Sequence, residues 1–288
     1  MTHTSQNVRG RLHLGFAYQL DSKHTSLALC EQQPPLQVIR AFSLPQGGAL
    51  VHLHNLSGGV LGGDQLELSV EVGPHAYAQL TTTSATRVYR SHADAPMALQ
   101  TNDIQVREGG LLEYLPDPLI PFAGARYQQL THIDLAEDGG LFWWETVAPG
   151  REARGEIFDY NELHLGLSIS VQGRPIAIER LKLEPAYRPL TSPARLGPYR
   201  YFCSFYICRA GLEPARWSSL ERELQALAQT LTQPGETVWG VSNLVAHGLL
   251  IRGLSRQGRT LPPGLLACWR AAKLALYGQE ALPPRKIY

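Results

Sequence analysis

The stretch that decides the fold lies at residues 58–72 and reads Gly-Gly-Val-Leu-Gly-Gly-Asp-Gln-Leu-Glu-Leu-Ser-Val-Glu-Val. Its second half, residues 65–72, alternates polar and apolar side chains, which is typical of a strand with one buried face. The glycines of its first half allow positive φ angles and the close approach of another segment. Gly-Pro-His at residues 73–75 breaks the alternation, and a second run follows at residues 76–80. We therefore expect two antiparallel neighbouring strands joined by a tight turn.

The glycine loop differs from loops that bind phosphate. A phosphate-binding loop carries Lys and then Ser or Thr after its last glycine, and it opens a helix whose amides point at the anion. Here Asp64 closes the loop and the strand-like run follows it. A dinucleotide-binding loop also opens a helix, so that class is disfavoured for the same reason. We interpret the glycines as a tight turn between strands.

The rest of the chain is mostly strand-like. Runs of ordinary strand length extend from residue 10 to about residue 209, and Gly or Pro separates nearly all of them. The apolar period changes to that of a helix at about residues 216–231 and again at about residues 264–277. The pattern predicts a mainly β protein, a single domain over residues 1–288, with two helices near the C-terminus.

The composition argues against two classes of partner. The 288-residue chain has 26 Lys and Arg against 25 Asp and Glu, a net charge of +1, which gives no electrostatic case for nucleic acid or an anionic membrane. No apolar run reaches the roughly 18 residues that favour a membrane-spanning helix. Residues 1–7 lack the apolar core of a signal peptide, so we expect a cytoplasmic protein.

Cysteines and histidines give only weak metal signals. The spacing of the cysteines is not that of a zinc site, and we expect reduced, buried thiols at Cys30, Cys203, Cys208 and Cys268. Cys203 and Cys208 would face opposite sides of one strand, because their numbers differ by an odd count. His52 and His54 would share a face and could bind a metal, although such pairs are more often hydrogen-bonded surface or core residues.

One acidic residue stands inside the most aromatic run of the chain. Glu145 lies within residues 141–147, Leu-Phe-Trp-Trp-Glu-Thr-Val, where a carboxylate is costly unless it finds a partner. Arg151 or Arg154 is the candidate partner for Glu145 or Glu156. A structural salt bridge is therefore at least as good an interpretation as a metal role.

Three motifs, taken in order, resemble the UreD (UreH) family of urease accessory proteins. They are Ser-Gly-Gly-Val-Leu-Gly-Gly-Asp at 57–64, Leu-Thr-Thr at 80–82 and Ala-Thr-Arg-Val-Tyr-Arg-Ser at 85–91. Ser57 stands where the family commonly has proline, and Arg87 where it commonly has lysine. The resemblance runs from about Gly10 to the tail at 283–288, which differs from the family's ending by an inserted Lys286 and by Tyr288 in place of tryptophan. The residues that we assign to the structural motif are Gly58, Gly59, Gly62, Gly63, Thr81, Thr82, Tyr89 and Arg90.

The resemblance implies both a fold and a function. The implied fold is a single elongated domain of helically wound β-strands with two late helices. The implied function is that of a non-enzymatic chaperone that binds apo-urease and UreF, and through UreF the GTPase UreG, and that helps load nickel without a tightly bound cofactor.

Three acidic residues are candidates for a transient nickel path. Asp64, Glu145 and Glu179 each stand in a stretch that matches the family. Scattered carboxylates suit an ion in transit, because a compact tight site would trap it. Structural pairing of the three with Arg87, Arg151 or Arg180 is an equally good interpretation.

Two other classes of function remain as alternatives. A hydrolase could use the same three carboxylates as general acid and base. A carbohydrate-binding β-scaffold could use Trp143 or Trp144, of which only one could be exposed for stacking, because adjacent strand residues face opposite sides. The sequence contains no Gly-x-Ser-x-Gly, His-Glu-x-x-His or Asp-x-Asp calcium-loop motif.

Overall fold

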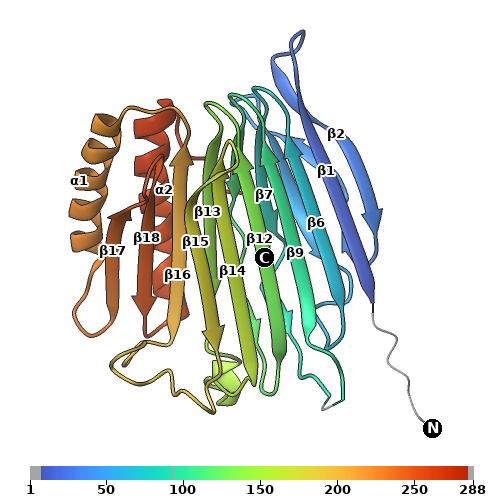
Figure 1. Cartoon of the computed structure of the whole chain (residues 1–288), viewed down its shortest axis with the longest axis vertical. Helices are drawn as coiled ribbons and strands as arrows, with labels where there is room; N and C mark the ends of the chain where they lie inside the picture. The colour runs from blue at the N-terminus through green and yellow to red at the C-terminus, as the bar shows by residue number, and fades with distance from the viewer. Residues whose placement is uncertain (1–7, 93, 285–288) are drawn as a thin grey trace.

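The protein, described by a computed structural model at residues 8–92 and 94–284, consists of two stacked β-sheets with two helices against one of them (Figure 1). The seven-stranded sheet contains, in spatial order, β15 (Arg174–Leu183), β14 (Glu162–Val171), β12 (Arg126–Leu135), β9 (Ala98–Val106), β6 (Gln65–Val72), β1 (Arg9–Gln19) and β2 (His24–Gln33). The mainly β architecture with two helices late in the chain confirms the expected fold class. The predictions made from residues 1–7, on a signal peptide, and from the tail at residues 285–288, on the family's ending, lie outside the described residues.

The second sheet has eleven strands. Its main order is β17 (Thr237–Asn243), β18 (Gly248–Ser255), β16 (Tyr201–Arg209), β13 (Gly140–Val147), β10 (Leu111–Tyr114), β7 (Tyr77–Thr82), β5 (Ala49–Asn55) and β3 (Leu36–Gln37). Three short strands lie off this main order: β4 (Ala41–Ser43) pairs with β5, and β11 (Leu119–Pro121) pairs with β13 and with β8 (Thr86–Val88).

Between β5 and β14 the chain passes repeatedly from one sheet to the other. Strands β5, β7, β10 and β13 are parallel neighbours in the eleven-stranded sheet. Strands β6, β9, β12 and β14 are parallel neighbours in the seven-stranded sheet. The chain therefore winds as a coil whose turns alternate between the sheets, in agreement with the helical winding that the resemblance implies.

The prediction that residues 65–72 and 76–80 pair as antiparallel neighbours is wrong. Strand β6 pairs with β1 and β9, whereas β7 lies in the other sheet and pairs with β5 and β10. The segment between them is a corner, in which the Gly73 amide donates to the Phe16 carbonyl (2.8 Å) and the His75 amide to the Glu108 carbonyl (2.9 Å). Alternation shows which face of a strand is buried, but it does not show which sheet receives the next strand.

Successive corners at this end are joined by backbone hydrogen bonds. The Gly109 amide donates to the Glu137 carbonyl (3.0 Å), and the Gly140 amide donates to the Gly110 carbonyl (2.8 Å). Each turn of the coil is thus aligned with the next at its corner as well as along its strands.

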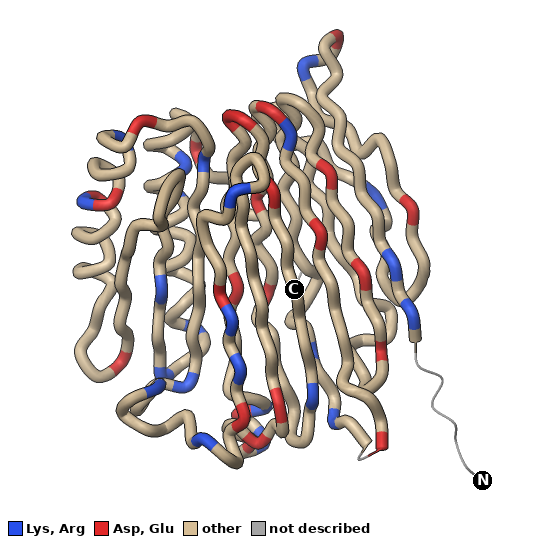
Figure 2. Tube along the Cα trace, in the orientation of Figure 1, with Lys and Arg blue, Asp and Glu red and all other residues tan. Residues whose placement is uncertain are grey.

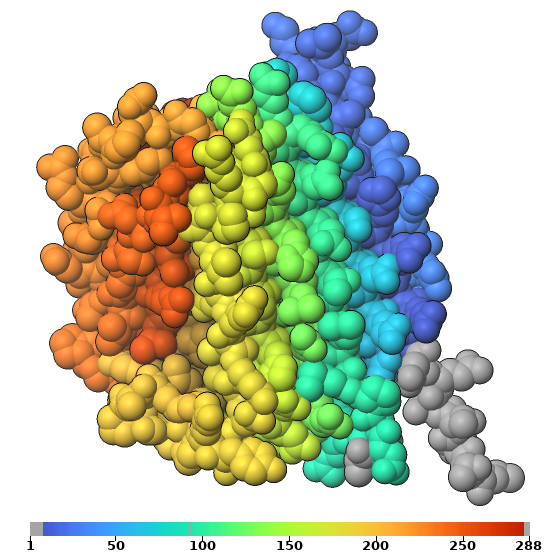
Figure 3. Space-filling view, in the orientation of Figure 1, coloured from blue at the N-terminus to red at the C-terminus, as the bar shows by residue number. Residues whose placement is uncertain are grey.

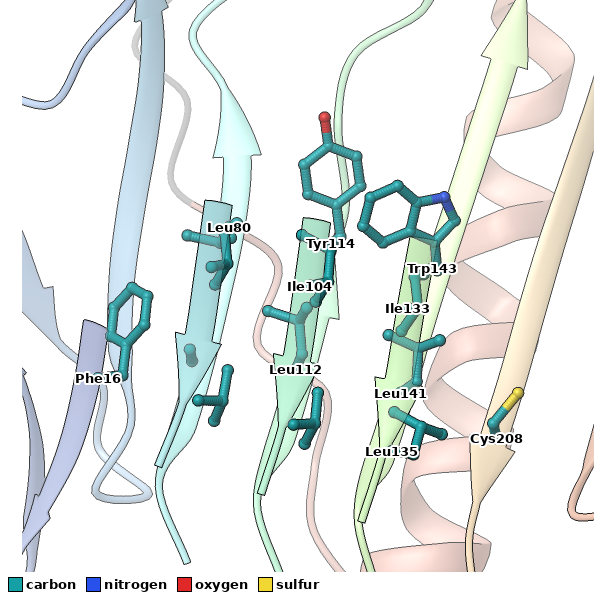
Figure 4. Packing of buried hydrophobic residues seen from close by; sticks show 14 of the residues in the cluster. Phe16, Leu80, Ile104, Leu112, Tyr114, Ile133, Leu135, Leu141, Trp143 and Cys208 are labelled. Carbon is teal, nitrogen blue, oxygen red and sulfur yellow. The ribbon is translucent and has the colours of Figure 1, made fainter. Parts of the chain in front are cut away.

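Apolar side chains from both sheets fill the space between them (Figure 4). Tyr114 stacks on Trp143, with ring centroids 4.0 Å apart and ring planes at 19°. The side chains packed around them include Leu80, Leu112, Leu141, Ile104 and Ile133. Burial of this cluster supplies a large part of the stabilisation of the fold, because apolar area removed from water contributes about 25 cal/mol per Å².

The helices cover the opposite face of the eleven-stranded sheet. Helix α1 (Pro214–Leu231) presents the expected apolar stripe, with Trp217, Leu220 and Leu224 buried. Helix α2 (Leu261–Tyr277) begins three residues before the expected start at 264. Its first turn accommodates two prolines, because the amides of a first turn have no partner within the helix. Short 3-10 turns are formed at η1 (Glu152–Arg154) and η2 (Gly258–Thr260).

The seven-stranded sheet forms the broad face of the molecule seen in Figure 3, and the residues that β6 turns outward, at 65, 67, 69 and 71, are all polar. Residues of both charge signs are interspersed along its strands (Figure 2), and Arg11 and Glu67 form an exposed ion pair across β1 and β6 at 2.9 Å. In residues 8–92 and 94–284, neither helix combines the length and the apolar character that crossing a membrane would require.

Candidate site in the interior between the sheets

The four glycines of the loop fall into two pairs with different roles. Gly58 and Gly63 have φ angles of 71° and 89°, which favour glycine. Gly59 and Gly62 are closely packed, and a Cβ on Gly59 would lie 2.5 Å from the ring of Tyr89. Both pairs fit a tight turn held against a neighbouring segment.

The first and third motifs bind each other through the backbone. The Val60 amide donates to the Arg87 carbonyl and the Tyr89 amide donates to the Val60 carbonyl, both at 2.8 Å. The Tyr89 hydroxyl also donates to the Gly58 carbonyl at 3.3 Å. Residues 58–64 and 85–91 therefore form one structural unit.

The threonines of the second motif and Arg90 bond to neighbouring segments. The buried Thr81 hydroxyl donates to the Leu115 carbonyl at 2.6 Å. The Thr82 hydroxyl accepts from the Asp117 amide at 2.9 Å, and Arg90 Nε donates to the Ala123 carbonyl at 3.5 Å.

Asp64 is buried at the end of the glycine turn, where its carboxylate accepts backbone hydrogen bonds. Its Oδ2 accepts from the Leu61 amide at 2.9 Å and its Oδ1 from the Val8 amide at 3.3 Å. Backbone amides, and not Arg87, are therefore the partners of this carboxylate, which corrects the pairing considered from the sequence. A role of Asp64 on a nickel path stays a prediction.

Glu145 faces the interior between the sheets. Gln129 on β12 donates through Nε2 to Glu145 Oε1 at 2.5 Å. Burial, with a smaller contribution from the charge of Glu179, raises the pKa of Glu145 to about 7 although the Gln129 hydrogen bond opposes this shift. Arg151, a candidate partner from the sequence, pairs with Glu156 instead. The partner of Glu145 is thus an amide from the facing sheet.

Glu179 on β15 connects the interior with the protein surface. Its Oε1 accepts from Arg252 Nη2 at 3.2 Å, and its Oε2 accepts from the Tyr206 hydroxyl. The side chain of Glu179 is 21% exposed and that of Arg252 is 58% exposed. Arg180 is not the partner, because consecutive residues of a strand face opposite sides.

Three small cavities follow one another through this interior. A cavity of about 20 Å³ is lined by both Glu145 and Glu179. A second, of about 40 Å³, is lined by Glu145, Gln129 and Tyr114. A third, of about 90 Å³, shares Tyr114 with the second and reaches the glycine loop and His54. Each exceeds the roughly 10–15 Å³ that one water molecule needs.

Both candidate stacking tryptophans are buried, so the carbohydrate-binding alternative loses its basis. Trp143 is fully buried between the sheets, and Trp144 is 7% exposed beneath the helices, where its indole N–H donates to the Pro116 carbonyl at 3.0 Å. They do face opposite sides of β13, as the alternation predicts, but helix α2 covers the second side. The expectation that one of them could be exposed is wrong, because a strand in a central layer is covered on both faces.

The other predicted metal candidates are dispersed. His52 contacts Phe42 edge-on with ring centroids 5.7 Å apart, and His54 lines the largest of the three cavities. In the described part of the chain, no group of three or more His, Cys, Asp or Glu side chains is placed to hold a metal ion.

The cysteines divide into one exposed and three buried thiols. Cys30 lies exposed on strand β2, which is at the edge of its sheet, so its predicted burial is wrong. Cys203 and Cys208 pack on opposite faces of β16, as their spacing predicts. Burial raises the pKa of Cys203 and of Cys268 to about 12, so both stay protonated thiols near neutral pH.

Sequence reasoning missed a further buried carboxylate, Glu113 on β10. Lys273 of helix α2 pairs with it at 2.8 Å, and both side chains are fully buried. The carboxylate also accepts hydrogen bonds from Tyr77 (2.8 Å), Gln79 (2.7 Å) and Trp269 (3.2 Å). The available signal was Lys273 itself, a charged residue on the apolar stripe of its helix.

Comparison with known proteins places the sequence in a family. Residues 8–287 match the family described as UreD urease accessory protein. The urease accessory protein UreD of Herpetosiphon aurantiacus is 49% identical over 276 residues, which cover 96% of either chain. The UreD proteins of Nitrosococcus oceani (32% over 279 residues, 96% of this chain and 88% of the relative) and Pseudomonas fluorescens (33% over 228 residues, 79% and 76%) are also similar. The motifs joined at the glycine turn and the sheets around the interior carboxylates thus belong to a chain that is a member of the UreD family of urease accessory proteins.

Proposed function

We propose that this chain acts in urease maturation as a non-enzymatic chaperone that binds apo-urease and UreF, and through UreF the GTPase UreG, and assists nickel insertion. Membership of the UreD family over nearly the whole chain supports the role in urease maturation.

The observation that carries the nickel role is that Glu145 and Glu179 line one interior cavity, which shared lining residues connect to two more. Ni²⁺ accepts carboxylate, imidazole and water ligands, and the three cavities are lined by the first two kinds and are large enough for the third. Glu179 also links this cavity to the protein surface, because it pairs with the exposed Arg252. An ion in transit would bind weakly in one cavity and then move to ligands in the next.

The same geometry disfavours the hydrolase alternative. The pKa values of two carboxyls must be separated for acid and base roles, and Glu145 does have a raised pKa. However, the cavity that Glu145 shares with Glu179 has a volume of about 20 Å³, which accommodates water but no sugar or peptide.

Metal analysis of urease matured in cells tests the nickel role. We expect Glu145→Gln and Glu179→Gln to leave the complex with urease and UreF intact in a pull-down, yet to lower the nickel content of the activated urease. Glu67→Gln, on the outer sheet face, is the matched control and should mature urease fully. Normal nickel content with both interior variants would remove them from the ion's route, and loss of the complex would assign them a structural role.

Size-exclusion chromatography tests the partner proposal separately. The wild-type chain should co-elute with UreF and should bring UreG into the complex only when UreF is present. A chain that ignores UreF, or that binds UreG equally well alone, would contradict the proposed order of contacts.

A further inference from the structure

Four polar side chains occupy the middle of the apolar interior face of the seven-stranded sheet. Gln100 and Asn102 on β9 stand in register with Gln129 and Thr131 on β12. The flanking strands carry leucines at the same levels: Leu66 and Leu68 on β6, Leu165 and Leu167 on β14. The alternating pattern of β9 and β12 would allow leucine at these four positions as well. The presence of polar side chains there therefore calls for a physical reason.

These side chains form a connected series of hydrogen bonds. Asn102 donates to the Thr131 hydroxyl and Gln100 donates to Asn102 Oδ1, both at 2.9 Å. The Tyr127 hydroxyl lies 3.0 Å from Gln100 Oε1 and 3.2 Å from Gln129 Oε1. The series links each amide to the next; Asn102 and Thr131 are each only 1% exposed, and Gln100 and Gln129 are half-buried.

The series ends on one group that can carry charge, the Glu145 carboxyl of the facing sheet. Gln129 accepts from Tyr127 with its oxygen and donates to Glu145 with its nitrogen. Gln129 and Glu145 together line the cavity of about 40 Å³, and Glu145 alone of the two also lines the next cavity. Glu145 therefore stands where two cavities meet, and Gln129 fixes one of its oxygens there.

We propose that Gln129 is a positioning residue, which holds Glu145 at the junction of the two cavities so that its second oxygen can meet a passing divalent cation. Tyr127, Gln100 and Asn102 keep the Gln129 amide turned toward the carboxyl. This inference rests on the proposed nickel role of Glu145. It gives a physical reason for polar side chains on two adjacent strands whose neighbours carry leucines at the same levels.

The test varies the amide and measures how urease activation depends on nickel concentration. Gln129→Met removes the amide at nearly constant length, and Gln128→Met changes the neighbouring glutamine, which faces the opposite side of β12. We expect Gln129→Met to raise the nickel concentration for half-maximal activation about tenfold, which is what loss of an outer-shell partner typically costs a metal site. The final activity at saturating nickel and the pull-down with UreF and urease should stay normal, and Gln128→Met should match wild type.

A second variant guards against misfolding. Gln129→Asn keeps the polarity but withdraws the amide by one methylene, and we expect the same shift in nickel dependence. Wild-type nickel dependence in a folded Gln129 variant, while Glu145→Gln is defective, would overturn the positioning role and leave the proposed function standing. If Glu145→Gln is also normal, the proposed function fails as well.

Discussion

Two acidic residues on adjacent strands of one sheet have opposite surroundings. Glu113 on β10 points toward helix α2 and meets Lys273 and three neutral donors. Glu145 on β13 points between the sheets, and its hydrogen-bond donor is the amide of Gln129. Among residues 8–92 and 94–284, no cationic side chain pairs with Glu145.

The difference shows how a partner decides the role of a buried carboxyl. A buried ion pair whose remaining lone pairs are satisfied fixes one arrangement of a helix on a sheet, and breaking it exposes the other charge to an apolar interior. A carboxyl held by an amide beside water-sized cavities keeps the ability to change its ligand or its proton. Glu113 therefore holds the helix on the sheet, whereas the surroundings of Glu145 suit the proposed nickel role.

Removal of Lys273 should have the largest effect on stability. Lys273→Met leaves Glu113 buried without its cation, and we expect a loss of about 3–5 kcal/mol in the free energy of unfolding, measured by urea denaturation. The double variant Glu113→Gln/Lys273→Met should recover part of that loss. A single variant within about 1 kcal/mol of wild type would show that the pair does not hold the helix.

Replacement of Glu145 should change the pH dependence of stability. Its folded-state pKa of about 7 lies above its ordinary value of 4.5, so the folded protein binds more protons than the unfolded chain between these pH values. Wild-type stability should therefore fall as pH rises from about 5 to 7.5. Glu145→Gln should remove roughly 1–2 kcal/mol of this fall, because the adjoining cavities are large enough for water, which would moderate the cost of the charge.

Thermal unfolding at pH 5.5 and 7.5 measures this difference. Glu67→Gln, which changes an exposed carboxylate, should keep the wild-type pH profile. An identical profile in wild type and Glu145→Gln would show that Glu145 is already ionised in the acidic range.

The Arg252–Glu179 pair should give a smaller effect. Its arginine is 58% exposed, so water screens the pair, and we expect Arg252→Met to cost about 0.5–1 kcal/mol. The measurement is the urea midpoint at pH 7.5. A loss as large as that of Lys273→Met would mean that Glu179 depends on its cation as fully as Glu113 does.

The exposed pair between Arg11 and Glu67 should contribute least. The two side chains are 64% and 51% exposed, and Arg11→Met should change the free energy of unfolding by less than about 0.5 kcal/mol. The three variants should be compared in one buffer and at one salt concentration. The loss of unfolding free energy should decrease from Lys273→Met to Arg252→Met to Arg11→Met, in the order of decreasing burial.

Local patterns predict much of this fold, because they depend on neighbouring residues. Alternation at residues 65–72 and the apolar stripe of α1 correspond to β6 and to a helix packed on a sheet. The sheet that receives each strand could not be predicted in this way. The corner at residues 73–75 has the residues of a hairpin turn, and only the contacts with Phe16 and Glu108 define its course.

The candidate site was predictable as a set of residues but not as an arrangement. Glu145 and Glu179 stand out in the sequence, but their partners come from Gln129, 16 residues away, and Arg252, 73 residues away. Such contacts depend on strand register across two sheets. The nearest arginines in sequence, 151 and 180, are therefore poor guides to the partners.

The bonded corners have a consequence for how the length of the interior is determined. Gly109 and Gly140 join successive turns of the coil through backbone amides, which every residue type except proline can supply. The number of turns between β5 and β14 therefore sets the length of the interior, and the corners restrict the residue type, because a Cβ on Gly140 would collide with the Tyr277 hydroxyl. A relative could differ at most surface positions and keep an interior of the same length. Insertion of one additional turn of the coil would lengthen the interior by a strand spacing of about 4.8 Å.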